Sequence, residues 1–249
     1  MKSLNEYIIE GGFFKNMNAE IVTPESKNEL IEIIKDTIAK EGPNCDLNFI
    51  DTSKIVDMSE LFQSTELSKF NGDISNWDVS KVKNMSGMFT WTQFSGDISK
   101  WDVSKVNYMN CMFANSKFNG DISKWNVSKV KYMSYMFMRS EFKGDISKWD
   151  VSKVYNMSNM FYNSPFNGDI SKWDTSSVTD MSFMFSSSQF TGDISKWNVS
   201  DVYTMQGMFS SSQFTGDISK WNVSNVKNMN GMFNDSKLRK LNKLPDWYK

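Results

Sequence analysis

Hydrophobic and polar positions along the chain recur with a period of 24 residues. From residue 70 to residue 237 the frame Phe-x-Gly-Asp-Ile-Ser-x-Trp-Asp/Asn-x-Ser-x-Val-x-x-Met-x-x-Met-Phe occurs seven times in succession. The aromatic residues that open the units are Phe70, Phe94, Phe118, Phe142, Phe166, Phe190 and Phe214. Tandem units of this length are typical of solenoids, in which a unit buries its apolar face only by stacking on its neighbours. The pattern therefore predicts one elongated domain rather than a globule with a single pocket.

Within one unit, the spacing of apolar residues predicts a strand followed by a short helix. Residues 74–79 have the Leu-x-x-Leu-x-Leu type of spacing, which places three side chains of a short parallel strand toward the core. Ser80 stands where a helix N-cap is expected, and the apolar positions of 82–89 fit one face of a helix. Gly72 permits a close approach or a positive φ before the strand. The predicted fold class is thus an α/β repeat solenoid.

Both ends of the repeat array carry segments suited to cover it. Thr23, Pro24 and the apolar stripe that follows predict a capping helix over residues 24–41. Downstream, Leu241 and Leu244 have the strand spacing and are expected to form the terminal cover. The expected organisation is a leader and capping helix at 1–45, a degenerate first coil at 46–69, seven repeats at 70–237 and a C-terminal cap at 238–249.

The repeat resembles a known family. The string Gly-Asp-Ile-Ser-Lys-Trp-Asp-Val-Ser-Lys-Val-x-x-Met-x-x-Met-Phe of residues 144–161 is similar to the repeats of BspA-like leucine-rich-repeat proteins of the mycoplasma-lipoprotein type, and the similarity extends over residues 46–236. It implies right-handed, leucine-rich-repeat-like coils, and most relatives are bacterial surface proteins that adhere to host or matrix proteins. This sequence has no signal peptide, lipobox cysteine or wall anchor, so we expect a cytoplasmic or virion-associated protein.

The first eleven residues carry a second resemblance. Residues 1–11 look like the capsid-targeting leader of tailed-phage internal proteins, with an Ile-x-Glu ending where a prohead protease would cut after Glu10. This resemblance implies a phage internal or virion-packaged protein. The alternative for this segment is a short amphipathic helix that packs on the cap.

Charge and composition argue against several classes of function. The 28 Lys and Arg residues balance 29 Asp and Glu residues, so a net charge of −1 predicts neither a nucleic-acid partner nor membrane insertion. The sequence has no histidine, no phosphate-binding glycine loop and no nucleophile elbow, which indicates a protein that is not an enzyme and needs no cofactor. Cys45 and Cys111 occupy non-equivalent positions and are expected to be free thiols.

Polar columns are expected on the surface. Lys100 and its equivalents run beside a column of mostly acidic residues that starts at Asp78, and we expect these charges to pair across strands and fix the register. A ligand groove for a repetitive polymer is the alternative for this face. Asp73 and its equivalents are expected to cap turns, with calcium binding as the alternative. The tryptophan column that starts at Trp77 is expected to point into the core.

Aromatic residues that break the repeat are the candidate site. Some lie at i, i+3 or i+4 spacings on the predicted helix, so they are expected to form a stripe along the convex side, which extends into the return loops. The residues are Tyr108, Tyr132, Tyr135, Tyr155, Phe183, Tyr203, Trp91 and Tyr162. These rings either cover seams between adjacent coils or form a protein-contact surface. The sequence thus favours a non-enzymatic binding or scaffold protein with an unidentified protein partner, and its alternatives are a phage internal protein and a passive spacer.

Overall fold

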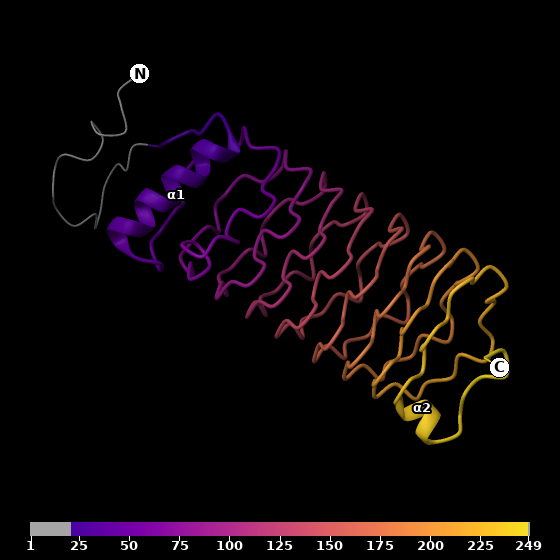
Figure 1. The fold of residues 1–249 in the computed structure, drawn as a ribbon. Helices are drawn as coiled ribbons and strands as arrows, with labels where there is room; N and C mark the ends of the chain where they lie inside the picture. The colour runs from indigo at the N-terminus through magenta and orange to yellow at the C-terminus, as the bar shows by residue number, and fades with distance from the viewer. Residues whose placement is uncertain (1–20, 249) are drawn as a thin grey trace.

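The chain winds into successive coils that lie side by side in an elongated stack (Figure 1). The structure is a computed structural model and describes residues 21–248, so the phage-leader resemblance lies outside the described residues. Helix α1, Lys27–Glu41, lies at one end of the stack, and helix α2, Lys237–Lys240, lies at the other. We number the coils from coil 1, residues 46–69, through seven 24-residue units to coil 8, residues 214–237.

Neighbouring coils are joined by single-residue parallel bridges. Coils 1 and 2 are bridged twice, from Asp46 to Asp73 and from Asp57 to Asn84, and each later bridge joins residues 24 apart. The chain of bridged residues continues through Tyr108, Tyr132, Asn156, Asp180, Thr204 and Asn228. Coil 1 is in register with the repeat, because the Met58 N–H donates to the Asn84 carbonyl at 2.9 Å.

The predicted helix in each repeat is wrong. Met85, Gly87 and Phe89 instead donate their backbone N–H groups to carbonyls of the next coil, at 2.9, 2.8 and 2.9 Å. The N–H groups between them close tight turns, as Met88 does to the Met85 carbonyl at 3.2 Å. Alternate N–H groups therefore leave the coil, and the i to i−4 bonds of a helix cannot form. We call residues 83–91 and their equivalents the ladder segment.

The predicted strand over residues 74–79 is also wrong, because the backbone of this stretch turns on itself. The Trp77 N–H donates to the Ile74 carbonyl at 3.2 Å within the coil. A side chain makes the bond between coils, since the Trp101 indole Nε1–H donates to the same Ile74 carbonyl at 3.2 Å. Each repeat tryptophan makes this bond to the preceding coil: Trp77, Trp101, Trp125, Trp149, Trp173, Trp197 and Trp221. From coil 2 onward, tryptophan side chains thus replace strand pairing on this side of the stack, whereas coils 1 and 2 are also paired through Asp46 and Asp73.

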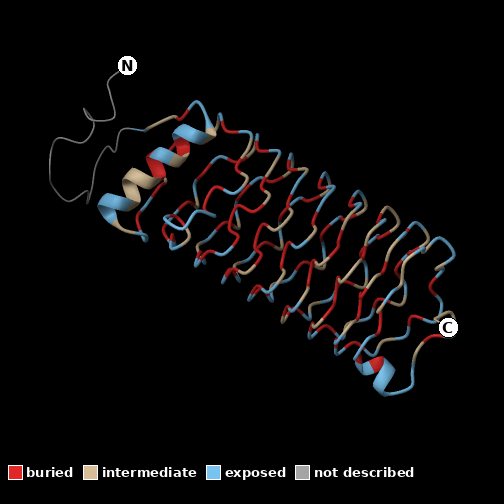
Figure 2. Cartoon of the chain, viewed as in Figure 1, coloured by how far each residue is buried: buried red, intermediate tan, exposed pale blue. Residues whose placement is uncertain are grey.

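The core runs without interruption along the inside of the coils (Figure 2). The prediction that the tryptophans point inward is confirmed, since the repeat tryptophans are only 3–5% exposed. Phenylalanine rings stack within and between coils: Phe89 lies 4.4 Å from Phe94 and 5.7 Å from Phe113, centroid to centroid. A Cβ on Gly96 would lie 2.8 Å from the Phe94 ring, so the repeat glycine is needed for close approach and not for a positive φ.

At the N-terminal end, α1 covers the first coil. It begins later than predicted, because the N-cap is Ser26, whose hydroxyl accepts from the Glu29 N–H at 3.2 Å, and not Thr23. Leu30, Ile33 and Ile34 are the buried residues of the helix, and they join the core.

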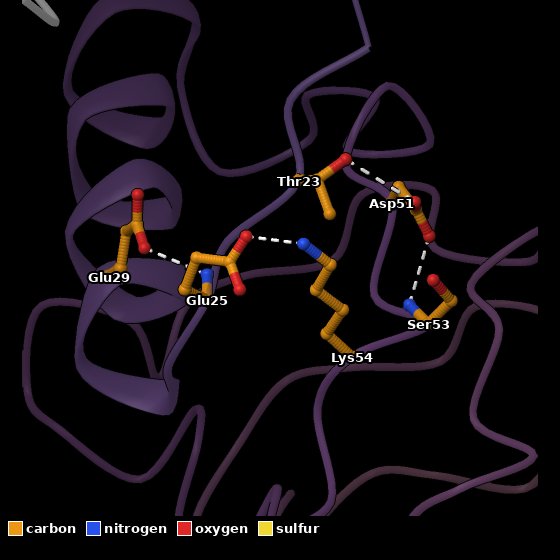
Figure 3. Close-up of polar contacts among 6 residues, drawn as sticks. All are labelled: Thr23, Glu25, Glu29, Asp51, Ser53 and Lys54. Atoms are coloured by element: carbon orange, nitrogen blue, oxygen red, sulfur yellow. Dashed lines mark hydrogen bonds and ion pairs between the residues drawn. The ribbon is translucent and has the colours of Figure 1, made fainter. Parts of the chain in front are cut away.

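Polar contacts tie the entry to α1 to coil 1 (Figure 3). The Thr23 hydroxyl donates to the Asp51 carboxylate at 3.3 Å, and the Lys54 ammonium pairs with the Glu25 carboxylate. The Asp51 carboxylate also accepts from the Ser53 N–H at 3.0 Å, and this bond is the main reason that the pKa of Asp51 is lowered.

At the C-terminal end, the predicted register is wrong. The Trp247 indole donates to the Ile218 carbonyl at 3.0 Å, which is the bond that each repeat tryptophan makes. Leu244 and Trp247 therefore take the places of the repeat isoleucine and tryptophan. Leu241, which was predicted to point inward, is 48% exposed.

Candidate protein-binding surface

Side-chain caps hold the turns of every coil. The prediction for Asp73 and its equivalents is confirmed: the Asp73 carboxylate accepts from the Ser75 N–H at 2.9 Å, and the Asp145 carboxylate accepts from Ser147 at 2.8 Å. Hydrogen bonds from Ser75 and Ser147 hold the pKa of these carboxyls below the ordinary value of 3.8. The same cap recurs at Asp97, Asp121, Asp169, Asp193 and Asp217.

A second cap replaces the predicted helix start. The Asp78 carboxylate accepts from the Ser80 N–H at 2.9 Å, so Ser80 is a donor in a turn and not a helix N-cap. Asparagine performs the same task in other coils, as Asn126 does for the Ser128 N–H at 3.2 Å. The turn therefore requires an acceptor oxygen but no charge.

A third cap lies at the start of the ladder segment, and in every coil except coils 3 and 4 a residue of the same coil makes it. Asn84, Asn156 and Asp180 accept from the N–H two residues further on, at 3.0, 2.8 and 2.8 Å. The equivalent residues of coils 3 and 4 are Tyr108 and Tyr132, whose side chains have no oxygen within reach of that N–H. In coil 4 the N–H in question, that of Ser134, donates instead to the Asn110 amide oxygen of coil 3 at 3.1 Å. These two coils thus carry exposed aromatic rings where the others stabilise a turn.

Three tyrosines of coils 3, 4 and 5 form one group on the surface. The rings of Tyr108 and Tyr132 are stacked with centroids 5.4 Å apart and planes at 2°, and Tyr155 meets Tyr132 edge to face at 6.3 Å. The exposed fractions are 43%, 36% and 43%, which is high for large aromatic residues. We call Tyr108, Tyr132 and Tyr155 the tyrosine cluster.

Tyr135 lies three residues beyond Tyr132 on the same ladder segment and occupies a position suited to glycine. Its φ is 61°, and positive φ recurs at this position in every coil, with glycine in three of them (Gly87, Gly207 and Gly231) and another residue in the rest (Glu60, Cys111, Asn159 and Phe183). A left-handed conformation costs a residue with a Cβ roughly 1–2 kcal/mol. Tyr135 is nevertheless 38% exposed, so burial of its ring does not offset that cost.

The other candidate rings do not join the tyrosine cluster. Phe183 lies against Gly207, where an added Cβ would come within 2.2 Å of its ring, so it covers a seam between coils 6 and 7. Tyr162 packs beneath the Arg139 guanidinium, 5.6 Å from its centroid, a contact that the sequence reasoning missed. Trp91 and Tyr203 are each 61% exposed, and neither pairs with another ring among the described residues.

The aromatic stripe does not form in the way that the sequence predicted. The expected i, i+3 and i+4 neighbours on a helix do not exist, because the ladder segment is not helical. The tyrosine cluster forms instead between residues 24 apart, or nearly so, on adjacent coils. An alignment of the coils could have identified this cluster from the sequence, because it shows in which coils the residue that caps the turn is replaced.

The expected charge pairing of the Lys100 column is wrong. In residues 21–248, ion pairs are confined to the N-terminal end and join Lys27 to Asp57, Lys54 to Glu25, and Lys35 to both Glu32 and Glu66. The acidic residues near the Lys100 column use their carboxylates to cap turns. Register is therefore fixed by turn caps, indole bonds and ladder bonds rather than by charge.

Features of a metal site or a membrane span are not found in the part of the chain that the structure describes. No group of three or more Cys, Asp or Glu residues between 21 and 248 is arranged to hold a metal ion. No helix in this range is long and apolar enough to cross a membrane.

One family of proteins matches the chain. The family model described as "Mycoplasma protein of unknown function, DUF285" matches twice, over residues 35–144 and 138–247. No curated protein and no solved structure is significantly similar. The two tandem matches meet near the boundary between coils 4 and 5, so the repeat is a property of the family.

Proposed function

Because the chain belongs to the DUF285 family of mycoplasma proteins and is a repeat protein, we propose that it is a non-enzymatic scaffold that binds another protein through the tyrosine cluster. We also propose that the fold is a right-handed solenoid of the BspA-like type. The stack of coils in register supports this fold class. One observation carries the proposal. The tyrosines of coils 3 and 4 stand exposed where other coils cap a turn.

The sequence allowed two interpretations of the candidate aromatic rings: covers of seams between coils, or a protein-contact surface. The surroundings of Phe183 favour the first interpretation, and those of the tyrosine cluster favour the second. A ring that covers a seam should pack against the neighbouring coil and be less exposed, as the partly buried Phe183 is where it lies against Gly207. The tyrosine cluster instead leaves more than a third of each side chain exposed. Tyrosine is enriched at protein interfaces because it offers a large apolar surface, a hydroxyl and few rotatable bonds.

The thiols support a non-enzymatic role. Burial and the nearby Glu41 carboxylate raise the pKa of Cys45 to about 11, and burial raises the pKa of Cys111. A catalytic cysteine needs a lowered pKa so that the thiolate forms near neutral pH. Neither thiol is activated in this way.

The repeat itself supplies the substitutions for a test. Asn occupies the Tyr108 and Tyr132 position in coils 2, 5 and 8, and Thr179 occupies the Tyr155 position in coil 6. The variant Tyr108→Asn, Tyr132→Asn, Tyr155→Thr should therefore fold, and the Tyr108→Asn change can add a cap in coil 3, whereas the Ser134 N–H of coil 4 already donates to Asn110. We expect an unchanged or higher melting temperature together with loss of partner proteins, measured by quantitative mass spectrometry after affinity capture from a mycoplasma lysate.

A matched control removes exposed rings elsewhere. The variant Trp91→Ser, Tyr203→Ser should keep the same partners, because these rings lie outside the tyrosine cluster. If the cluster variant melts at a clearly lower temperature and keeps its partners, the rings are seam covers and the proposal is wrong.

The alternative of a phage internal protein rests only on residues 1–11. Mass spectrometry of virions would support it if the chain began at Gly11. An intact Met1 in the particle would exclude processing after Glu10.

A further inference from the structure

Charge is distributed unevenly along the ladder side of the stack. Stretches 79–95, 103–120, 127–140 and 151–168, which contain the ladder segments of coils 2 to 5, have no Asp or Glu. They carry Lys81, Lys83, Lys105, Lys117, Lys129, Lys131, Arg139 and Lys153, all of which are exposed. The net charge of the whole chain conceals this basic region.

The equivalent stretches of coils 6 and 7 have the opposite character. Residues 175–192 and 199–216 contain no Lys or Arg, and they carry Asp180 and Asp201. The column that is lysine in coils 2 to 5 becomes Ser177, Asp201 and Asn225 in coils 6 to 8. The change occurs at coil 6, immediately after the last ring of the tyrosine cluster.

The basic stretches coincide with the tyrosine cluster. Lys105 lies three residues before Tyr108, and Lys129 and Lys131 lie within three residues before Tyr132. The turn-capping carboxylates of the column that starts at Asp78 border this region. One of them is Asp102, and Lys105 and Lys129 both help to lower its pKa. No ion pair within residues 21–248 engages these lysines, so their ammonium groups remain available to a partner.

We propose that the tyrosine cluster and the lysines around it form a docking surface for an acidic, aromatic-containing polypeptide segment of a partner protein. Lysines would meet carboxylates along the segment, and the tyrosines would pack against its apolar side chains. Complementary charge of this kind raises the association rate and excludes wrong partners. This inference rests on the proposed function and adds the chemistry of the partner.

A single-stranded nucleic acid is the other anionic polymer that lysines and aromatic rings can bind, but the ring geometry is unfavourable for it. Sequence-tolerant binding of single strands needs free ring faces on which successive bases stack. Here Tyr108 and Tyr132 stack on each other at 5.4 Å, and Tyr155 turns to meet Tyr132 at 63°. The stack uses one face of each ring and the edge-to-face contact uses a third face, whereas ring edges and hydroxyls remain for carboxylates and apolar side chains.

The test compares two triple variants that remove the same charge. Lys105→Gln, Lys129→Gln, Lys153→Gln changes the lysines beside the tyrosine cluster. Lys172→Gln, Lys196→Gln, Lys220→Gln changes three exposed lysines of coils 6 to 8. The probes are a fluorescent peptide of alternating Glu and Phe, the same peptide with Lys in place of Glu, and a single-stranded oligothymidine, each followed by fluorescence anisotropy on the full chain.

We expect the Glu-Phe peptide to bind the wild type, to bind the first variant at least about tenfold more weakly, and to bind the second variant within about twofold of the wild type. Affinity should also fall as salt rises, because the attraction is between exposed charges. The Lys-Phe peptide should not bind.

Three results would overturn the inference: oligothymidine binding in preference to the Glu-Phe peptide, equal effects of the two lysine variants, or no binding of the acidic peptide at all. The proposed function is tested separately by partner capture. If the tyrosine variant loses its partners while the Lys105, Lys129, Lys153 variant keeps them, the proposed function stands and the acidic partner is excluded.

Discussion

At the scale of single residues, the repeat tryptophan has two roles that its burial alone does not reveal. Its ring fills the core, and its indole N–H joins two coils on a side of the stack where the structure of residues 21–248 has no backbone bond between coils from coil 2 onward. For Trp149 the acceptor is the Ile122 carbonyl, at 3.1 Å. A buried residue of this kind contributes both packing and a hydrogen bond.

Trp149→Phe should therefore lower the free energy of unfolding by about 2–4 kcal/mol, from a lost indole bond and an underfilled core. The matched control is Trp91→Phe, at a tryptophan that is 61% exposed, where the change should stay within about 0.5 kcal/mol. Urea unfolding followed by circular dichroism measures both. Equal effects at the two sites would show that the buried indole does not hold the coils together.

The tyrosine cluster is the opposite case at this scale, because its residues depart from what the backbone favours. Tyr108 and Tyr132 cannot cap the turns of their own coils, and the neighbouring Tyr135, which is not part of the cluster, adopts a φ of 61° at a position that is glycine in three coils. Residues that reduce stability without burial point to a function outside the fold. This is the physical reason for placing the site in coils 3 to 5.

At the scale of elements, each coil is a series of capped turns rather than a strand and a helix. The Asp145 carboxylate accepts from the Ser147 N–H at 2.8 Å, and every repeat has the same bond. A turn of this kind needs an acceptor at the first residue, whether it is charged or neutral.

Asp145→Ala should lower the free energy of unfolding by about 0.5–1.5 kcal/mol, because the Ser147 N–H loses its partner. Asp145→Asn should cost less, since Asn126 and Asn198 cap equivalent second turns of coils 4 and 7 with their amide oxygens. Thermal melts of the two variants provide the comparison. An asparagine variant as unstable as the alanine variant would mean that the charge, and not the turn, is what matters.

The sequence predicted which residues are buried but not the backbone that buries them. Ile74, Trp77 and Val79 point inward as expected, because a fixed period places the same side chains toward the core whatever bonds the backbone makes. The apolar spacing of 82–89 fits a helix and a series of turns equally well. What decides between them is whether N–H groups bond within the coil or to the next one, and hydrophobic periodicity carries no information about that.

The candidate site was predictable in part. All five tyrosines of coils 3 to 5 were among the predicted residues, but their grouping was attributed to a helix that does not exist. The lysines at 105, 129 and 153 were missed, although their stretches lack acidic residues. The net charge of the whole chain does not reveal this basic region, because it is summed with the acidic residues of the later coils.

At the scale of the whole molecule, the turn caps make stability depend on pH. Hydrogen bonds from nearby serines hold the pKa of many aspartates, such as Asp73, Asp97 and Asp145, below the ordinary value of 3.8. Because the folded pKa is lower than the unfolded one, this contribution is complete above pH 3.8 and is lost as the pH falls through the folded pKa.

The melting temperature should accordingly be nearly constant from pH 8 to pH 5, where no histidine is present to titrate, and should fall steeply below about pH 4. Differential scanning calorimetry across this range measures the effect. A melting temperature that rose on going from pH 5 to pH 3 would contradict the role assigned to the carboxylates.

The coils are alike in frame but differ in their surface residues, and deletions of different coils can distinguish a binding protein from a passive spacer. Removing residues 94–141 or residues 166–213 takes out two complete coils in register and shortens the stack equally. The first deletion removes Tyr108 and Tyr132, whereas the second leaves the tyrosine cluster and its lysines in place.

The most direct measurement is capture from one lysate by the wild type and by these two deletion variants, with the retained proteins quantified by mass spectrometry. We predict that the chain lacking residues 166–213 keeps the partners of the wild type and that the chain lacking residues 94–141 loses them. Equal retention or equal loss by the two variants would contradict a binding surface in coils 3 to 5.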